Sequence, residues 1–533
     1  EMCIRDSFGA MSEKEKGAFY NRIQPVFESF QDFCVQRLAR QSGEGIAERL
    51  YDLQLSTKAI LLNASNKVRN AIMNSGDVEL QKMFQHWQQT KEELVRYYSF
   101  TTEERARLKI DLAKVEEQAN DLEKKLSERS AQFGNIGKKI ITWKDVQASL
   151  KPNETAIEII RVKKKFVTDS VYYAALILNS QSTKPKLLIW PEGSKLETRW
   201  YRYLRNMIKF QQHDTLSFKH IWAPLLRELP TSQTLYISCD GVFNKINLNC
   251  IQNPANGRYT LDEYNIRLVS NTRELTEAHP SMKNPSAQAS IFGYADFNLP
   301  GSNQTSVAIT SAGKRASRFG FQGEEIPMLP ATKKEVTLLN DLLSTKSWKI
   351  DAFMLQDASE ENLKKINNPQ ILHIATHGFF LNDVDLSDEL ESNEESQLVK
   401  NPLFRSGILL AGAGVQQNSS PEDGVLTAYE AMNLALDNTE LVALSACETG
   451  LGEVRNGEGV YGLQRSFLVA GARTVIMSLW QVDDDATQEL MSSFYTKWIS
   501  GVDKFQAFRA AQLEIKEKYT LPFYWGAFVL IGN

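Results

Sequence analysis

The spacing of apolar residues divides the chain into a helical first part and an α/β remainder. From about residue 18 to residue 133, apolar positions recur every three or four residues, and glycine and proline are sparse. This is the period of an α-helix that buries one face. In the stretch YDLQLSTKAILLNASNKVRNAI the positions at helical spacing are Leu53, Leu55, Ile60, Leu61, Val68 and Ile72. We therefore predict a region of helical hairpins or repeats over residues 15–138.

One segment of this region has the spacing of a coiled-coil seam. Its apolar residues, with charged residues between them, are Leu108, Leu112, Val115, Ala119, Leu122 and Leu126. A free coiled coil usually needs three or four heptads, and this segment, 108–126, has fewer than three. We expect it to pack on a neighbouring helix of the same chain, and an intermolecular coiled coil is the alternative.

After residue 139 the pattern changes to short apolar strands separated by helices or turns. The first run of strand-like segments is TAIEIIRVKKKFV, SVYYAALIL, PKLLIW, TLYISC and ASIFGYA, and the second is ILHIAT, SGILLAG, LVALSA and TVIMSLW. Apolar strands that alternate with helices predict an α/β fold with a mostly parallel sheet and helices on both faces. We place the first α/β half at residues 139–296 and the second at 297–533. The acidic loop 382–400 lies within the second half, and we expect it to be mobile.

Composition narrows the class of protein. The 61 basic and 65 acidic residues give a net charge of −4, which indicates neither a nucleic-acid partner nor a membrane surface. Five scattered cysteines, without a CxxC motif, fit a reducing compartment, so we expect a cytoplasmic protein. No apolar run approaches the length of a membrane span. The first residues, EMCIRDS, resemble a translated adapter sequence, and we expect residues 1–14 to be an unfolded or artefactual tail.

Two strand-like segments end on chemically reactive residues. ILHIATHGFF leads to His377 and Gly378, and LVALSACETG leads to Cys447 and Gly450. The carboxyl ends of parallel strands meet at one edge of a sheet, so both side chains should lie in one crevice, with room in the sequence for an intervening strand. A Cys thiolate is a nucleophile, an imidazole can act as its base, and the backbone N–H groups of Gly378 and Cys447 can hold an oxyanion.

These and nearby residues also have simpler interpretations. Taken alone, Cys447 is more simply a small core residue, and His377 a polar residue at a strand end; only the pair favours a dyad. His373 and His377 are four apart, which would suit a metal on a helix, but on a strand they only share a face, so we expect no metal and His373 beneath the site. The run GEGVYG has dinucleotide-binding glycine spacing but begins ten residues after its strand, so we predict a helix-start turn and no cofactor.

Several motifs resemble those of a known family. They are ATHGFF, NPLFRSGILLAGA, DGVLTAYEAMNL, LVALSACETGLGEV, GEGVYGLQRSF and SLWQVDDDAT. Together they resemble the CHAT domain family, which is related to caspases and separase, over roughly residues 140–533. The resemblance implies a caspase-type fold, a peptidase dyad at His377 and Cys447, and tetratricopeptide-like repeats on the N-terminal side. It also makes 139–296 the non-catalytic half and 297–533 the catalytic half, with Cys239 a structural residue.

The resemblance also suggests where a substrate would bind. An acidic residue four positions after the corresponding Trp reads a basic P1 side chain in separase-like relatives, which points to Asp484, with Trp480 and Asp483 beside it. Ser445 stands where several Arg- or Lys-cleaving relatives carry Asp, and Asp485 with Gln488 matches a helix cap, so an apolar pocket is equally compatible. We predict a cysteine endopeptidase that cleaves protein or peptide substrates and is regulated by a protein partner or a signal through its helical region. The alternative is a catalytically silent scaffold that acts by protein interaction.

Overall fold

The computed structural model describes most of the chain. The described ranges are 11–40, 45–99, 102–133, 140–164, 170–229, 234–276, 287–299, 325–381, 402–414, 422–446, 449–450, 452–455 and 457–532. Most of the predicted tail and all of the acidic loop 382–400 lie outside these ranges. Within them, the first helix already begins at Glu13, inside the predicted tail.

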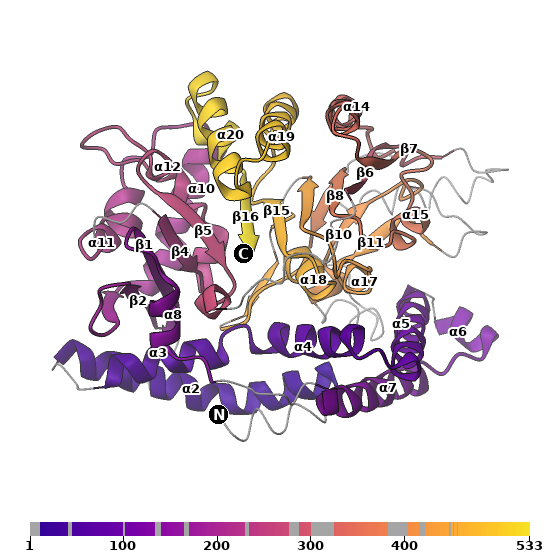
Figure 1. The fold of residues 1–533 in the computed structure, drawn as a ribbon, viewed down its shortest axis with the longest axis horizontal. Helices are drawn as coiled ribbons and strands as arrows, with labels where there is room; N and C mark the ends of the chain where they lie inside the picture. Colours follow the sequence, from indigo (N-terminus) through magenta and orange to yellow (C-terminus); the bar gives the residue numbers. More distant parts are fainter. Residues whose placement is uncertain are drawn as a thin grey trace.

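The first part of the chain is helical, as predicted. Its helices are α2 (Glu13–Arg40), α3 (Ile46–Thr57), α4 (Ile60–Asn74), α5 (Val78–Ser99), α6 (Thr102–Leu108) and α7 (Leu112–Phe133). They form a layer beneath the α/β part of the molecule (Figure 1).

The predicted heptad segment is not one continuous helix. Leu108 ends α6 and is half exposed, and Lys109 takes a left-handed backbone conformation (φ 57°) before α7 starts at Leu112. Within α7 the seam residues Ala119 and Leu126 are buried, and α7 packs on α4 and α5 of the same chain. Only the part of the seam that lies in α7 forms a continuous helix, and it packs within the chain, as predicted.

The α/β part contains one eleven-stranded sheet in the order β3-β2-β1-β4-β5-β16-β15-β12-β8-β6-β7. Its strands are β1 (Glu154–Lys163), β2 (Val171–Asn179), β3 (Lys186–Trp190), β4 (Thr234–Ser238), β5 (Asn265–Val269), β6 (Gln288–Ala295), β7 (Lys349–Leu355), β8 (Ile371–Ala375), β12 (Leu441–Ser445), β15 (Thr474–Ser478) and β16 (Phe528–Gly532). Adjacent strands are parallel except at β3-β2, β2-β1 and β16-β15. The predicted α/β fold with a mostly parallel sheet is confirmed.

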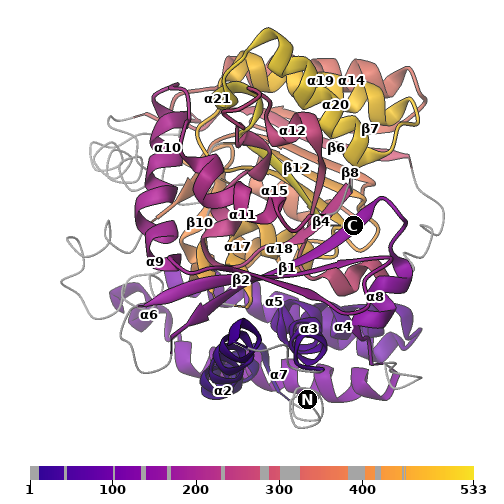
Figure 2. The ribbon, with the colours of Figure 1, turned by 90° about the vertical axis from the view of Figure 1, so that its left-hand side faces the viewer.

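Helices cover both faces of this sheet (Figures 1 and 2). In the second half, α14 (Pro330–Ser344), α19 (Asp484–Ile499) and α20 (Lys504–Lys518) pack on one face, and α17 (Ala428–Ala431) and α18 (Leu463–Val469) pack on the other. The first half is covered by α10 (Tyr201–Lys209) and α11 (Ala223–Leu226) on one face. Its other face packs against α2, α3 and α8 (Trp143–Ser149), so the helical region completes that core.

The two halves of the sheet meet where β5 pairs with β16, in parallel, through Leu268 and Ile531. Strand β6, which the predicted boundary at residue 296 assigns to the first half, lies between β8 and β7 in the second. The division of the sheet therefore falls before Gln288.

Two small sheets stand apart from the main one. The first contains β9 (Gly378–Phe380), β10 (Ser406–Leu409) and β11 (Val425–Thr427), all antiparallel, and the second is the hairpin of β13 (Glu453–Arg455) and β14 (Gly459–Tyr461). The segment SGILLAG, expected in the parallel sheet, supplies β10 of the first small sheet instead. Its apolar residues are buried in either arrangement, so periodicity could not separate the two.

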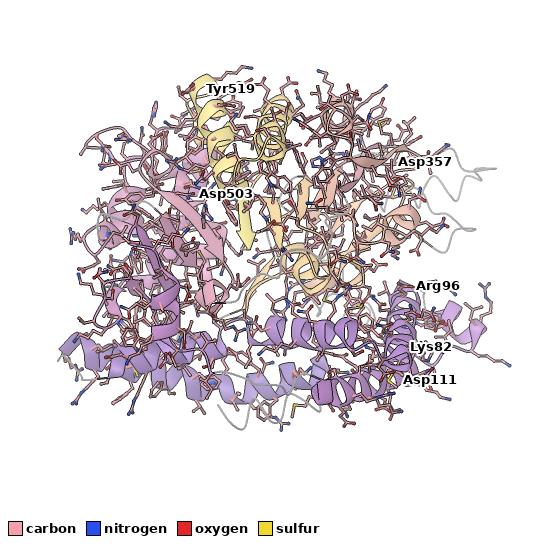
Figure 3. The ribbon with its side chains drawn as sticks, viewed as in Figure 1. Lys82, Arg96, Asp111, Asp357, Asp503 and Tyr519 are labelled. Atoms are coloured by element: carbon pink, nitrogen blue, oxygen red, sulfur yellow. The ribbon has the colours of Figure 1, made fainter. Side chains whose placement is uncertain are left out.

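The outer surface carries charges of both signs. Exposed side chains such as Lys82, Arg96 and Asp357 lie at the periphery (Figure 3). Among the described ranges, no helix has the length and apolarity needed to cross a bilayer.

Candidate active site

The strands that precede His377 and Cys447 are direct neighbours in the sheet. β8 and β12 are parallel, and their register runs from Ile371 opposite Leu441 to Ala375 opposite Ser445. His377 follows the end of β8 by two residues, and Cys447 follows the end of β12 by two. The two strand ends therefore lie side by side, as the sequence allowed, and the strands between them in sequence, β9, β10 and β11, belong to a separate small sheet. Cys447 itself lies outside the described residues.

The backbone at the ends of the two strands is held together by hydrogen bonds. The N–H of Thr376 donates to the carbonyl of Ser445 at 3.3 Å, which continues the pairing one residue beyond β8. The Oγ1 of Thr376 donates to the carbonyl of Leu409, and the N–H of Leu409 donates to the carbonyl of His377 at 2.9 Å. The chain then leaves the main sheet and enters β9. His377 is thus fixed where the chain passes from one sheet to the other.

The imidazole of His377 is oriented by a backbone carbonyl. Its Nε2 lies 2.8 Å from the carbonyl oxygen of Pro327, and its ring is tilted against the buried ring of Phe297, with centroids 5.1 Å apart. Because a carbonyl can only accept, Nε2 carries the hydrogen, and the lone pair of the neutral ring is on Nδ1. Burial lowers the pKa of His377, and the Pro327 hydrogen bond opposes part of that shift. The neutral ring is the form that can accept a proton.

The residues just after the cysteine are attached to the neighbouring strand β15. The N–H of Gly450 donates to the carbonyl of Ser478 at 2.7 Å, and the N–H of Ser478 donates to Oγ1 of Thr449 at 3.2 Å. A Cβ on Gly450 would lie 2.9 Å from the Ser478 oxygen, so this close approach requires glycine.

The three predicted substrate-binding residues follow β15. The half-buried indole of Trp480 donates from Nε1 to the carbonyl of Phe523 at 3.2 Å. Asp483 caps α19 by accepting from the N–H of Ala486 at 2.9 Å. The pattern of Asp485 with Gln488 matches a cap two residues later, and the structure does not use it. Asp484 is the first residue of α19 and is exposed. Partial desolvation of its carboxyl group, and then the charges of nearby carboxylates, raise the pKa of Asp484.

A buried polar cluster that sequence reasoning missed lies beneath the strand ends. Glu335 of α14 places Oε1 3.0 Å from Nε2 of His373 on β8, and its Oε2 accepts from Oγ of Ser445 on β12 at 3.0 Å. The other ring nitrogen of His373, Nδ1, lies 3.2 Å from the hydroxyl of Tyr495. His373 is fully buried beneath the strand end, as expected. No motif marks Glu335, which lies far from both strands in sequence.

The possible metal and nucleotide sites have structural explanations. Among the described residues, one acidic group has a spacing that could suit a cation, Glu360 with Glu422 and Glu430, and the ammonium of Lys364 contacts all three carboxylates. In the glycine-rich run, two glycines belong to the β13-β14 hairpin and its turn, and Gly462 directly precedes α18. The run is therefore a hairpin followed by a helix start.

The three described cysteines are poor nucleophiles. Burial raises the pKa of Cys34 to about 11 and of Cys239 to about 12, and it raises the pKa of Cys250 well above its ordinary value. All three are free thiols. A thiol held protonated in this way reacts slowly.

Comparison with known proteins identifies the family. The model of the CHAT domain matches residues 216–533, which is more than half of the chain. The chain belongs to the CHAT domain family, as its motifs predicted. It is also similar to tetratricopeptide repeat protein 28 of Homo sapiens (24% identity over 219 residues, 38% of this chain and 8% of that protein) and of Mus musculus (23% over 218 residues, 38% and 9%). The chain thus matches less than a tenth of the length of these relatives.

Among solved structures, the chain is similar to the Arg specific cysteine proteinase gingipain R (TM-score 0.33, 10% identity, 57% of this chain and 63% of that chain). It is also similar to the Saccharomyces cerevisiae separase-securin complex (TM-score 0.38, 10% identity, 76% and 32%). These scores are too low to align individual residues, so the geometry of the site rests on the chain's own contacts.

Proposed function

We propose that the chain is a cysteine endopeptidase in which Cys447 is the nucleophile and His377 the general base. The observation that carries the proposal is the pairing of β8 with β12, which ends both strands side by side two residues before these side chains. The oriented, neutral imidazole of His377 supports the same assignment. The membership of the chain in the CHAT domain family supports it as well.

The proposed reaction follows from the tautomer of His377. Nδ1 accepts the thiol proton of Cys447, and the thiolate sulfur bonds to the scissile carbonyl carbon. The backbone N–H groups of Gly378 and Cys447 stabilise the oxyanion that forms. The imidazolium then gives its proton to the departing amine as the C–N bond breaks. Water, deprotonated by His377, hydrolyses the thioester and restores the thiol.

The test is mapping of new protein N-termini in a proteome treated with purified protein. Cys447→Ala and His377→Ala should each abolish the new termini while leaving the fold intact, and Cys34→Ala is the control for loss of a thiol elsewhere. Full cleavage by Cys447→Ala would refute the dyad. A wild-type protein that produces no new termini and cleaves no peptide would favour the alternative, a silent scaffold.

Regulation through the helical region is part of the proposal, because that region contacts the segment that follows the cysteine. The N–H of Ala59, between α3 and α4, donates to the carbonyl of Gly457 at 2.6 Å. The N–H of Leu61 lies 3.2 Å and 3.3 Å from the two carboxylate oxygens of Glu458, whose Oε2 also accepts from Arg465 at 3.3 Å. Gly457 and Glu458 form the turn of the β13-β14 hairpin, ten residues after Cys447.

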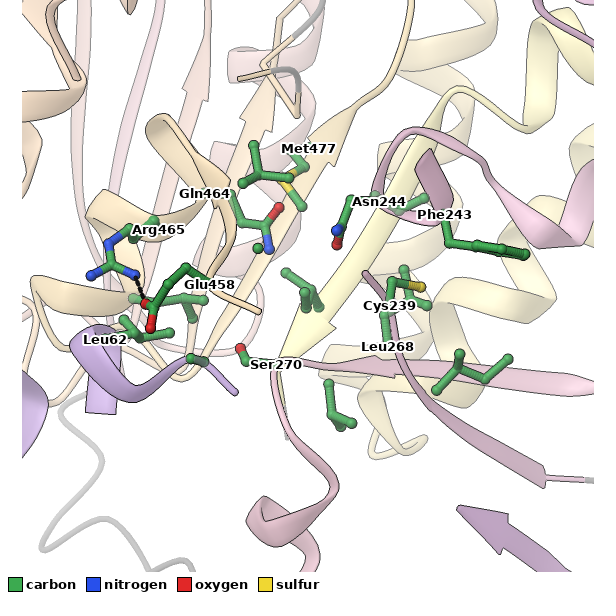
Figure 4. Close-up of a pocket in the computed structure, with 18 of the residues that line it drawn as sticks. Leu62, Cys239, Phe243, Asn244, Leu268, Ser270, Glu458, Gln464, Arg465 and Met477 are labelled. Carbon is green, nitrogen blue, oxygen red and sulfur yellow. Dashed lines mark hydrogen bonds and ion pairs between the residues drawn. The ribbon is translucent and has the colours of Figure 1, made fainter. Parts of the chain in front are cut away.

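The hairpin turn lies where three parts of the molecule meet. A cavity there is lined by Lys58 of the helical region. Cys239 and Asn244 of the first half and Glu458 and Arg465 of the second also line it (Figure 4). Beside it, the ammonium of Lys58 lies 3.0 Å from the buried carboxylate of Glu158 in β1. A partner that moves the α3-α4 junction would therefore pull on the hairpin and, through ten residues, on the cysteine.

This part of the proposal has its own test. Glu458→Ala removes the carboxylate that both the helical region and α18 contact, and it should increase hydrogen exchange of residues 449–462 and change the cleavage rate. The exposed Glu79→Ala on α5 is the matched control. Faster exchange with an unchanged cleavage rate would separate the hairpin from catalysis and contradict regulation by this route.

A further inference from the structure

The carboxylate of Glu335 joins the two strands that lead to the proposed dyad. Its two oxygens contact different strands, His373 on β8 and Ser445 on β12, each at 3.0 Å. All three side chains are more than nine-tenths buried. His373 lies four residues before His377, and Ser445 lies two residues before Cys447. One side chain from α14 therefore spans both strands directly beneath their ends.

Core stability does not explain a carboxylate at this position. Its neighbours on α14, Val336 and Leu339, pack in an apolar core with α19 and β12. Removing a carboxylate from water costs several kcal/mol, and a well-packed apolar side chain of similar volume is often as stable or more so. The contact of Oε1 with His373 has the distance of an ion pair without the alignment of a hydrogen bond, so one oxygen is not fully satisfied. An incompletely satisfied buried carboxylate at a strand junction calls for a role other than packing.

The charge of Glu335 also reaches the surroundings of the proposed site. It contributes, after burial, to raising the pKa of Tyr495, the partner of His373. It contributes, after burial and the neighbouring aspartates, to raising the pKa of Asp484 at the start of α19. The same helix, α14, follows Pro327, whose carbonyl orients His377. The segment from Pro327 to Glu335 thus contacts the base directly and both strands from below.

We propose that Glu335 is a positioning residue of the peptidase, which clasps β8 to β12 and so fixes the separation of His377 and Cys447. The proposal rests on the proposed function for its meaning in catalysis. The backbone pairing of β8 with β12 remains without the clasp, but the side chains beneath the strand ends can then shift. A misplacement of about 1 Å between reacting groups can lower a rate on the order of a hundredfold. The effect should appear in kcat, because the clasp contacts no substrate.

The test uses four variants of the full chain. Glu335→Ala removes both contacts, and Glu335→Gln keeps an acceptor for Ser445 and a polar group beside His373. Ser445→Ala removes one end of the clasp while leaving the carboxylate in place. Asp341→Asn, an exposed carboxylate of the same helix, is the control. Each is measured for kcat and KM on a cleaved peptide and for the pH profile of Cys447 alkylation by iodoacetamide.

We expect Glu335→Ala to lower kcat about 10- to 100-fold with little change in KM and to shift the alkylation profile, because Cys447 and His377 no longer hold a fixed geometry. Glu335→Gln should recover kcat to within a few-fold of wild type. Should Glu335→Ala not fold, Ser445→Ala must lower kcat without raising KM. A folded Glu335→Ala with wild-type kcat and alkylation profile, or a Ser445→Ala with both unchanged, would overturn the proposal.

The alkylation profile separates this proposal from the proposed function. If wild-type protein cleaved no peptide, the peptidase assignment would fail. The proposed role of Glu335 would then be tested by the pH profile of Cys447 alkylation alone. A shift of this profile in Glu335→Ala would support the role, and an unshifted profile would overturn it.

Discussion

The pKa of Glu458 makes the contact between the helical region and the hairpin dependent on pH. Burial, opposed by Arg465 and by backbone N–H groups, raises the pKa of Glu458 from an ordinary value of 4.5 to about 7. The folded protein therefore holds this proton more tightly than the unfolded chain does. The stability that results is fully present below pH 4.5 and is lost as the pH rises through 7.

The magnitude follows from the two pKa values. With a pKa raised from 4.5 to about 7, ionising Glu458 costs roughly 3 kcal/mol more in the folded protein than in the unfolded chain. The wild type should therefore lose roughly 2 to 3 kcal/mol of its free energy of unfolding between about pH 5 and about pH 8. Glu458→Gln resembles the protonated form and cannot ionise. At about pH 8 the free energy of unfolding of Glu458→Gln should therefore exceed that of the wild type by roughly 3 kcal/mol. At pH 5 this difference should shrink to about 1 kcal/mol or less.

The assay is urea unfolding followed by far-ultraviolet circular dichroism at both pH values, with Glu79→Gln on exposed α5 surface as control. The control should follow the wild type at each pH. If wild type and Glu458→Gln lost stability in parallel between the two pH values, the buried carboxyl would not be the group that titrates, and the reasoning would be refuted.

Three further predictions concern the proposed site. Because burial lowers the pKa of His377 below its ordinary value of 6.5, the midpoint of the acidic decline in kcat/KM should lie below pH 6.5; a midpoint above pH 6.5 would contradict this. Iodoacetamide should label Cys447 well before Cys34, Cys239 and Cys250, whose thiol pKa values are raised, as followed by peptide mass spectrometry. Equal labelling of all four would count against an activated thiol. In a panel of fluorogenic peptides that differ at P1, a preference for Arg or Lys that collapses in Asp484→Ala would support an acidic pocket, whereas a wild-type preference for Leu or Met would exclude it.

Much of the fold was predictable because its signals are local. A strand of apolar residues such as ILHIA and a helix with apolar residues at every third or fourth position are encoded by neighbouring residues, and the alternation of the two predicts a mostly parallel sheet. The strand-end positions of His377 and Cys447 were predictable for the same reason, since each is two residues beyond a clear apolar run. The exit of the chain from β8 into a second sheet at Gly378 was not predictable, because Gly378–Phe380 is too short to stand out as a strand and the segment that supplies β10 has the pattern of an ordinary buried strand.

Contacts between distant segments were decided by the tertiary structure alone. The sequence places a histidine and a cysteine at the ends of two strands, but strand order in a sheet is set by which apolar faces pack together. Here that order makes β8 and β12 direct neighbours and puts the segment SGILLAG, which lies between them in sequence, in a separate sheet. Three further contacts were not predictable either: Pro327 with His377, Glu335 with two strands, and Ala59 with Gly457. Each joins two elements that are distant in sequence, and nothing in the residues of either element indicates the other. The sequence by itself determined the residue types and the elements that carry them, because these depend on local periodicity. Only the packing of those elements determined their neighbours, because burial is non-directional and many arrangements of the same elements satisfy it equally well until the whole core is assembled.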